Sequence, residues 1–391
     1  MSPTQQFIAD HSDDDVQKLA LQAARYPEVD MAFALRQIAG RQKVKNKIPS
    51  FYQNPLLHYP AQLSLEQSSS EITARYKAEL CSGHCFADLT GGFGIDMAFI
   101  AAKFEKAFYV ERQTELCDIA THNFGILGLS HITVFNGDAV DFVQDMPGVD
   151  MIFLDPARRG HGGQKVFRLA DCEPDVSALK NTLLTKAPKV MIKLSPMLDI
   201  SQLQKDLTHI SEIHILSVDN ECKELLAIME RGFEGNTQII TQNFAKDSRQ
   251  TFSFGNEDES ASMPLFASHT GKYLYEPNSS IMKAGAFRLV AAYFNLQKLH
   301  PHTHLYTSDE IITDFPGRVF EIVKVSGHSK QELKNINAET PKANIAVRNY
   351  PDSVEILRKK TGIKDGGDDY IFACKMLDEK YYIISTKKIT Q

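Results

Sequence analysis

The sequence predicts an α/β fold, in which a mostly parallel sheet is covered by helices, preceded by a helical region and followed by a small α+β module. Three observations lead to this prediction. Residues 1–80 space apolar residues three and four apart, as amphipathic helices do, and contain no convincing strand. From residue 84, short runs that are apolar on both faces alternate with helical patterns, which is typical of a parallel sheet buried on both sides. After residue 317, strands and helices alternate and end in a hairpin.

The N-terminal region holds three predicted helices. Residues 13–26 and 29–44 carry amphipathic patterns, and Asp30 is a suitable cap for the second of them. A third helix is expected to begin near residue 69, with Ser69 or Ser70 as its cap. These elements form a helical layer in front of the first strand.

Seven short apolar runs predict the strands of the central sheet. They lie at residues 85–90, 107–111, 132–135, 149–155, 189–194, 212–219 and 224–229. The last two are separated by only a few residues, so we expect an antiparallel hairpin at the edge of the sheet. The polar stretch 235–272 predicts a boundary and a surface loop. The segment 273–317 that follows contains a helix through residues 281–296.

The end of the chain predicts a compact ferredoxin-like layer of two helices and four strands. The expected order is strand 319–325, helix 329–335, strand 343–349, helix 353–362, and a hairpin of residues 370–377 and 380–386. Taken together, the patterns predict a helical N-terminal region at 1–80, a sheet domain at 81–235, a linker and ferredoxin-like segment at 236–317, and a terminal module at 318–391.

The composition excludes several classes of protein. The 391 residues suggest two to four domains at roughly 100–200 residues each. The longest apolar stretches are about five residues, far below the roughly 20 that a bilayer requires, and the polar N-terminus has neither the basic start nor the apolar run expected of a signal peptide. Six scattered cysteines favour a reducing cytoplasm over a disulfide scaffold. Cys81, His84 and Cys85 lack a second pair at zinc-finger spacing, so no metal site is expected.

The charge is unevenly distributed along the chain. The net charge of −6 excludes a histone-like nucleic-acid binder, but residues 318–391 hold 14 lysines and arginines against 10 acids, a net charge of +4. No acidic residue occurs between Asp30 and Glu66. The basic residues in that stretch are Arg36, Arg41, Lys43, Lys45 and Lys47. The stretch is either a solvated helix face or a patch that faces phosphate groups.

The segment DLTGGFGID, residues 88–96, follows a predicted strand and opens a predicted helix. Its glycines let the backbone turn tightly and approach a ligand closely, although such a turn alone suits a dinucleotide, a nucleoside cofactor or no ligand. Acidic residues stand at the ends of four successive predicted strands: Asp88, Glu111, Asp138 and Asp155. Because ligands bind at the carboxyl edge of such a sheet, the four acids predict a cofactor site there.

This set of residues resembles the class I S-adenosylmethionine-dependent methyltransferases. The resemblance implies S-adenosylmethionine as the cofactor and a Rossmann-like, seven-stranded methyltransferase core. It assigns the methionine part to Asp88, Thr90, Gly91, Gly92 and Gly94, the ribose to Glu111, and the adenine to Asp138.

The fourth-strand motif is DPARRG, residues 155–160. It resembles the Asp/Asn-Pro-Pro-aromatic motif of base-directed RNA and DNA methyltransferases and, more closely, the Asp-Pro-Pro-Arg of the uridine C5 enzymes. This chain has Ala157 in place of the second proline and an arginine in place of the aromatic residue. The uridine chemistry requires a cysteine nucleophile, for which Cys172 is the only nearby candidate.

Direct transfer of the methyl group to nitrogen requires no covalent intermediate, and it is the reaction that we expect. Asp155 is then the acceptor of the departing proton, with Pro156 and Arg158 beside it. The residues expected to border the substrate at the same edge are Arg159, Lys193 and Ser195.

Several flanking segments resemble bacterial methyltransferases that carry a C-terminal THUMP-like domain. They lie at residues 65–78, 220–226, 273–287, 342–351 and 358–373. The resemblance implies an RNA substrate, docked by basic residues of the terminal module that include Arg348, Lys359 and Lys360. Methylation of a small molecule or a protein, and a non-catalytic RNA-binding role, stay open as alternatives. The sequence indicates no membrane partner and no particular oligomeric state.

Overall fold

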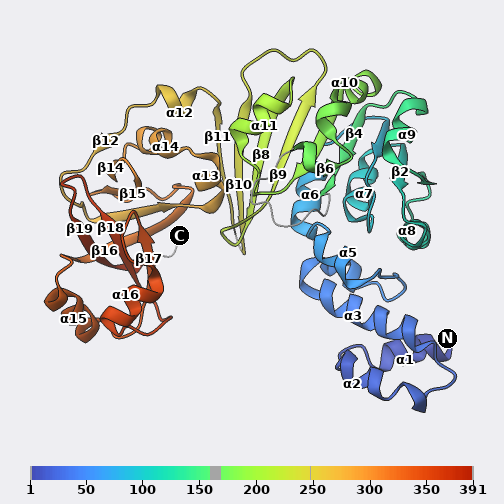
Figure 1. Cartoon of the computed structure of the whole chain (residues 1–391), viewed down its shortest axis with the longest axis horizontal. Helices are drawn as coiled ribbons and strands as arrows, with labels where there is room; N and C mark the ends of the chain where they lie inside the picture. The colour runs from blue at the N-terminus through green and yellow to red at the C-terminus, as the bar shows by residue number, and fades with distance from the viewer. Residues whose placement is uncertain (1, 159–168, 247, 390–391) are drawn as a thin grey trace. The chain divides into compact units, whose positions relative to one another are not determined.

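The computed structural model describes residues 2–158, 169–246 and 248–389 of the chain. The chain forms two compact units (Figure 1). The first contains Met1–Glu212 and Leu225–Gly235, and the second contains Ile213–Glu224 and Asn236–Gln391. The domain limits expected from the sequence stay a prediction.

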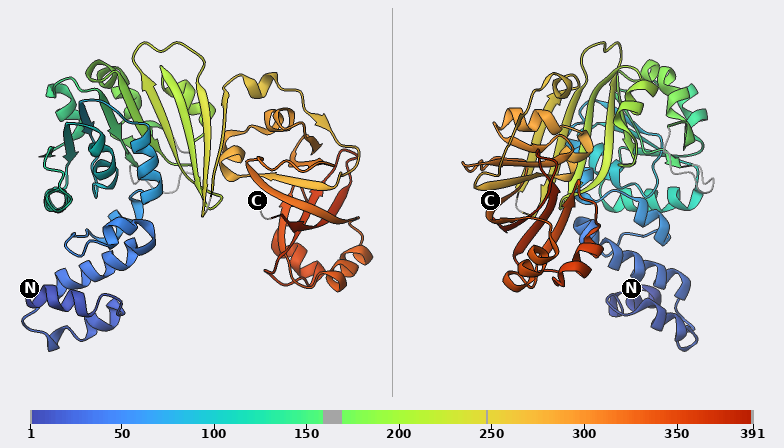
Figure 2. Two further views of the ribbon diagram at one scale, coloured as in Figure 1. Left: turned by 180° about the vertical axis from the view of Figure 1, so that it is seen from behind. Right: turned by 60° about the vertical axis from the view of Figure 1, so that its left-hand side comes forward.

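The N-terminal region is helical, as predicted, and both views of Figure 2 show these helices in blue. They are α1 (Pro3–Asp10), α2 (Val16–Leu21), a 3₁₀ turn (Ala23–Arg25), α3 (Met31–Lys47), α4 (Pro49–Tyr52), α5 (Gln62–Gln67) and α6 (Glu71–Glu79). Asp30 caps α3 by accepting a 3.0 Å hydrogen bond from the backbone N–H of Phe33. Ser70, the second of the two expected serines, caps α6 by accepting from the N–H of Thr73.

The central sheet has nine strands in the order β11-β10-β8-β9-β7-β4-β1-β2-β3. Seven of them match the predicted runs: β1 (Cys85–Asp88), β2 (Lys106–Glu111), β3 (Ile132–Asn136), β4 (Met151–Leu154), β7 (Lys189–Leu194), β8 (Ile210–Val218) and β9 (Glu221–Glu230). The first five pair in parallel, and β9 runs antiparallel to β7. The chain moves outward from β1 to β3 and then returns to β4 on the other side of β1. Parallel α/β sheets bind ligands at such a reversal.

Strand β4 is buried along its whole length, as its continuous apolar run predicts. Helices connect the strands of the sheet. The helices are α7 (Ile95–Ile100), α8 (Thr114–Ile126), α9 (Ala139–Asp145), α10 (Val176–Lys186) and α11 (Ile200–Asp206), with 3₁₀ turns at Ala101–Lys103 and Leu169–Asp171. A separate two-stranded ribbon, β5 (Ala157–Arg158) with β6 (Cys172–Glu173), follows β4.

The expectation of a surface loop after residue 235 is wrong. Strands β10 (Gln238–Ala245) and β11 (Ser248–Gly255) form an antiparallel hairpin there, so β8 and β9 do not end the sheet. The polar composition concealed these strands, because their buried polar side chains are satisfied within the hairpin. Thr241 Oγ1 donates to the carbonyl of Phe252 at 3.0 Å, and the Gln242 side chain accepts from Arg249 Nε at 2.9 Å.

The second unit is built on an eight-stranded sheet in the order β12-β14-β15-β13-β16-β19-β18-β17. Its strands are β12 (Leu265–Phe266), β13 (Tyr273–Pro277), β14 (Gln297–His300), β15 (Thr303–Ser308), β16 (Gly317–Ser326), β17 (Asn344–Arg348), β18 (Asp369–Lys375) and β19 (Tyr381–Lys388). Its helices are α12 (Asp258–Ala261), α13 (Ser279–Ala284), α14 (Phe287–Tyr293), α15 (Lys330–Glu339) and α16 (Val354–Thr361).

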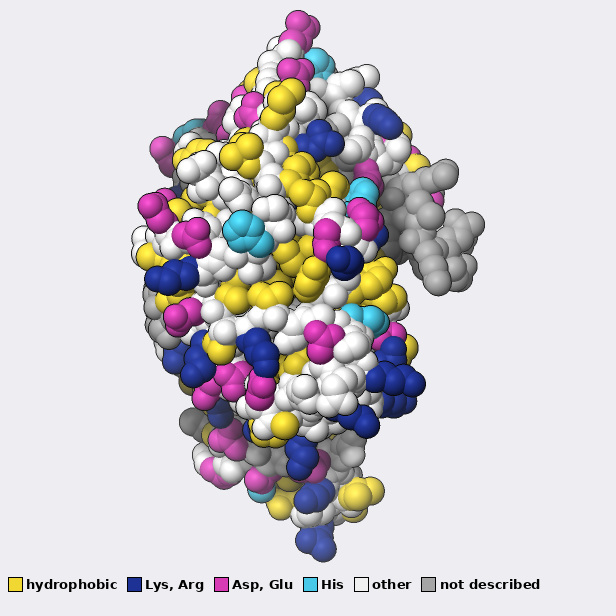
Figure 3. Space-filling model, turned by 90° about the vertical axis from the view of Figure 1, so that its left-hand side faces the viewer, with side chains coloured by type: hydrophobic (Ala, Val, Ile, Leu, Met, Phe, Trp, Pro, Cys, Tyr) yellow, Lys and Arg dark blue, Asp and Glu magenta, His cyan; other side chains and the backbone are white. Residues whose placement is uncertain are grey.

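The predicted strand–helix–strand–helix–hairpin order of the terminal module is confirmed by β16 through β19. The single helix expected through residues 281–296 is wrong, because Gly285 adopts a φ of +74° and ends α13. On the face shown in Figure 3, lysine and arginine side chains are interspersed with acidic ones. The net positive charge of the module therefore does not produce a face of one sign there.

Candidate active site

The glycine-rich turn joins β1 to α7 at the carboxyl edge of the central sheet. A Cβ on Gly91 would lie 2.1 Å from the ring of Tyr109, so only glycine fits at this position. The N–H of Gly91 donates to the carbonyl of Val110 at 2.8 Å. Gly92 and Gly94 have φ angles of +55° and +83°, in the left-handed region that glycine adopts readily. The turn is therefore fixed in one shape, and the N–H groups of Gly91, Gly92 and Gly94 are all hydrogen-bonded within the protein.

Asp88 ends β1 and is buried. Its Oδ1 accepts a 3.0 Å hydrogen bond from the backbone N–H of Thr90. Burial, with smaller contributions from the neighbouring carboxylates of Asp96, Asp155 and Glu111, raises the pKa of Asp88 well above its usual range. The Asp88 carboxyl therefore keeps its proton to a higher pH than an exposed carboxyl does, and a cationic ligand beside it would favour the charged form.

Glu111 ends β2 and connects that strand to the glycine turn. Its Oε2 accepts from the N–H of Gly92 at 3.0 Å, and its Oε1 accepts from the N–H of Gln113 at 2.9 Å. Each carboxylate oxygen keeps a second lone pair for a ligand hydroxyl group. Asp138 follows β3 and caps α9, where its Oδ1 accepts from the N–H of Val140 at 2.7 Å.

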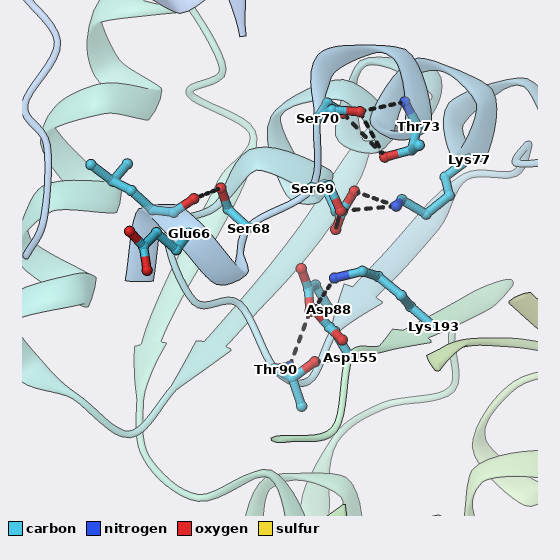
Figure 4. A network of polar contacts seen from close by, with 12 residues as sticks. Glu66, Ser68, Ser69, Ser70, Thr73, Lys77, Asp88, Thr90, Asp155 and Lys193 are labelled. Atoms are coloured by element: carbon cyan, nitrogen blue, oxygen red, sulfur yellow. Dashed lines mark hydrogen bonds and ion pairs between the residues drawn. The ribbon is translucent and has the colours of Figure 1, made fainter. Parts of the chain in front are cut away.

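Asp155 follows β4 and makes two contacts that define its position (Figure 4). Its backbone N–H donates to Thr90 Oγ1 at 2.6 Å, which ties it to the glycine turn. Its Oδ2 lies 2.5 Å from the Nζ of Lys193, which comes from β7. The structure thus brings Asp88, Thr90, Asp155 and Lys193 together from three parallel strands.

The remaining residues predicted beside the substrate follow β4 and β7. Pro156 is buried, and Arg158 lies in β5, whose backbone pairs with Cys172 and Glu173 of β6. Glu173 also pairs with Arg112 at 2.9 Å, so the ribbon is attached to the end of β2. Arg159 falls outside the described residues. Ser195 follows β7, and its Oγ accepts from the N–H of Met197 at 3.3 Å.

Comparison with known proteins identifies the family. The chain is 32% identical to a protein from Porphyromonas gingivalis W83 that carries the assignment methyltransferase, and the two structures superpose with a TM-score of 0.91 over 99% of this chain and 98% of that one. Two Mycobacterium tuberculosis proteins, from strains CDC 1551 and H37Rv and named uncharacterized S-adenosylmethionine-dependent methyltransferases, are 22% identical over 303 residues, 77% of this chain and 80% of theirs. The chain is an S-adenosylmethionine-dependent methyltransferase of this family.

Two family models match the C-terminal part of the methyltransferase. A ferredoxin-like domain matches residues 273–316, and a THUMP domain-like model matches residues 317–387. The predicted enzyme class, cofactor and terminal THUMP-like module are thereby confirmed. Within the described residues, no helix is long and apolar enough to cross a membrane. The same residues contain no group of three metal-ligating side chains, and Cys81 is buried.

The sequence reasoning missed a buried ionic group next to the glycine turn of the methyltransferase. Lys77 of α6 is fully buried and lies 3.1 Å from Asp96 of α7. Ser69 connects the two, donating to Asp96 Oδ2 at 2.7 Å and accepting from Lys77 Nζ at 2.9 Å; Figure 4 shows Lys77 directed at Ser69. The burial of Lys77 among Thr73, Ala74, Tyr76 and Ala78 is a property of the folded helix, and no signal for it was present in the sequence itself.

The basic residues predicted to dock RNA in the terminal module differ in their surroundings. Arg348 pairs with Glu276, a buried carboxylate that Arg318 also contacts, and Lys360 pairs with Asp352 at 2.6 Å. Lys359 is exposed. Two of the three predicted charges are therefore already engaged within the protein.

Proposed function

We propose that this methyltransferase transfers a methyl group to a nitrogen atom of a base in RNA. The observation that carries the proposal is the position of Asp155: its backbone is hydrogen-bonded to the glycine turn and its carboxylate is oriented by Lys193. A proton acceptor thus lies beside the site expected for the cofactor, where direct transfer to nitrogen requires one.

The residues at the sheet edge fit S-adenosylmethionine. Its methionine part carries an ammonium group and a sulfonium, and these cations would favour the charged form of the buried Asp88 carboxyl. Thr90, Gly91, Gly92 and Gly94 form the turn against which this part would lie. Glu111 retains lone pairs for the ribose hydroxyls, and Asp138 stands beyond β3, at the place proposed for the adenine amino group.

The bound cofactor supplies an electrophilic methyl group on its sulfonium. The protein's part is to bind the base in line with that group and to accept the proton that the base nitrogen loses when its lone pair forms the new bond. Asp155 receives this proton, and Lys193 keeps its carboxylate in place. Pro156 restricts the backbone beside Asp155, while Arg158 and Ser195 stand on the segments that flank the base. No cysteine is required, so Cys172 has no part in this reaction.

The support for RNA as the substrate comes from the terminal module. The THUMP domain-like match covers residues 317–387, and RNA binding is the usual activity of THUMP domains. The DPARRG motif adds to this support, because the enzymes whose motifs it resembles methylate nucleic-acid bases.

Labelled methyl transfer tests the proposal directly. The wild-type protein is incubated with methyl-labelled cofactor and with RNA from cells that lack the gene, and the modified nucleoside is identified by mass spectrometry. We expect the label in one nucleoside of RNA, and we expect Asp155→Asn to slow its incorporation about a hundredfold while retaining cofactor binding. Label that enters protein or small molecules but not RNA would establish one of the alternative substrate classes. A protein that binds RNA without transferring any label would be a binding factor.

A further inference from the structure

Two cations and one aromatic ring form a group on the N-terminal helices. The Cζ of Arg41 lies 4.7 Å from the centroid of the Tyr52 ring, and the Nζ of Lys45 lies 5.5 Å from the same centroid. Arg41 and Lys45 are one turn apart on α3, and Tyr52 is the last residue of α4. We refer to these three residues as the Tyr52 site.

The Tyr52 site carries two positive charges, and among the described residues one of them, that of Lys45, is paired with a carboxylate. Other cations of α3 have close carboxylate partners: Arg36 pairs with Glu115 at 2.8 Å and Lys43 pairs with Glu66 at 3.0 Å. Lys45 pairs with the exposed Asp13 at 3.4 Å. The Arg41 guanidinium lies over the Tyr52 ring and also interacts electrostatically with Tyr59, and in the described part of the chain it forms no ion pair with a carboxylate. An anion is therefore the ligand that this surface suits.

The Tyr52 site is attached to the cofactor turn through the core of the first unit. Phe51, next to Tyr52, packs edge-on against Phe93 of the glycine-rich segment, with ring centroids 5.9 Å apart. Val44 and Ile48 belong to the same buried cluster as Phe93. A ligand bound at the Tyr52 site is consequently held by the unit that also carries Asp155.

We propose that the Tyr52 site binds a single-stranded segment of the substrate RNA, with one base against the Tyr52 and Arg41 planes and the flanking phosphates beside Arg41 and Lys45. Aromatic rings and guanidinium planes are the surfaces on which proteins stack unpaired bases. Cations at a helix C-terminus also interact favourably with the helix dipole, but this effect does not account for an arginine placed over the tyrosine ring. The inference rests on the proposed RNA substrate.

Binding of the full-length protein to a labelled 12-nucleotide RNA without self-complementarity tests this site by fluorescence anisotropy. We expect Arg41→Ala with Lys45→Ala to weaken binding at least tenfold and to lower the slope of log affinity against log salt by roughly 0.7 per cation. Tyr52→Leu should weaken binding by about fivefold or more without changing that slope, because it removes stacking and no charge. Tyr52→Phe keeps the ring and should bind like wild type.

Two controls keep the outcomes distinct. Lys103→Ala removes an exposed lysine of the same unit and should leave RNA affinity unchanged. Calorimetry with S-adenosylhomocysteine should give wild-type affinity for all these variants, which shows that they are folded. The proposal is wrong if the Arg41 and Lys45 double variant and Tyr52→Leu bind RNA like Lys103→Ala, or if the wild type does not bind the RNA. Binding that depends on the Tyr52 site without methyl transfer to RNA would instead support the site and refute the proposed substrate.

Discussion

Lys193 and Asp155 form an ion pair across the carboxyl ends of β7 and β4, with 2.5 Å between Nζ and Oδ2. The lysine side chain is 12% exposed and the aspartate side chain 36%, so both charges are partly removed from water. Under these conditions, a charge-assisted hydrogen bond fixes the orientation of a carboxylate more firmly than a hydrogen bond from a neutral donor would. Lys193 therefore acts on Asp155. The sequence predicted both residues at the same edge of the sheet, but it did not predict their direct ion pair.

Replacing Lys193 should impair methyl transfer more than cofactor binding. We expect Lys193→Met to lower kcat roughly tenfold or more, and Asp155→Asn to lower it about a hundredfold, the lower range for loss of a general base. Lys193→Arg keeps the positive charge and should retain more activity than Lys193→Met. Rates measured with saturating cofactor, together with calorimetry, separate the two effects. Full activity of Lys193→Met would show that the ion pair does not orient the base.

The buried ionic group beside the glycine turn should control stability. Lys77→Met removes the cation and leaves Asp96 charged and buried, which should destabilise the protein by about 3–5 kcal/mol. Combining Lys77→Met with Asp96→Asn removes both charges, so the double variant should recover part of this loss. Urea unfolding of the wild type and the three variants measures the coupling. Additive effects of the two substitutions would contradict a direct interaction.

The sequence allowed the central strands and their carboxylates to be predicted because both follow local rules. A continuous apolar run marks a buried parallel strand such as β4, and an acid after each run falls at one edge of the sheet. The hairpin of β10 and β11 could not be recognised in this way, since its buried Thr241 and Gln242 are paired only in the folded sheet. The partners of Lys77 and Arg348 were hidden for the same reason: long-range ion pairs leave no periodic pattern.

The raised pKa of Asp88 gives the stability a defined dependence on pH. In the unfolded chain this carboxyl loses its proton near pH 4, whereas the native protein keeps it to a higher pH. Between these two pKa values the native state binds more protons than the unfolded chain. Asp88 therefore makes the protein less stable as the pH rises from about 4 through the raised pKa of the native state. We expect Asp88→Asn to reduce this loss, measured as the urea midpoint at a series of pH values.

A matched control for this pH dependence is Asp150. Its pKa is lowered by hydrogen bonds from the backbone N–H groups of Cys85 and His84. Asp150 therefore stabilises the native protein when the pH is above about 4, the pKa of this carboxyl in the unfolded chain. This stabilisation is lost as the pH falls through the lowered pKa of the native state. Asp150→Asn should thus change stability in the opposite direction with pH from Asp88→Asn. Parallel pH profiles for the two variants would contradict the assignment of the Asp88 effect to burial.

The close packing of the glycine turn predicts different outcomes for two glycine-to-alanine substitutions. Gly91→Ala would place a methyl group 2.1 Å from the buried Tyr109 ring, which cannot yield without disturbing β2. The turn must therefore shift, and we expect affinity for S-adenosylhomocysteine to fall at least tenfold, with a loss of stability of about 1–3 kcal/mol. Gly125→Ala is the matched control, because that helical glycine has nothing within 4 Å of an added Cβ. Alanine should stabilise α8 by about 0.5–1 kcal/mol and leave cofactor affinity unchanged. Calorimetry and thermal unfolding of the two variants measure both quantities, and wild-type cofactor affinity in Gly91→Ala would place the cofactor away from this turn.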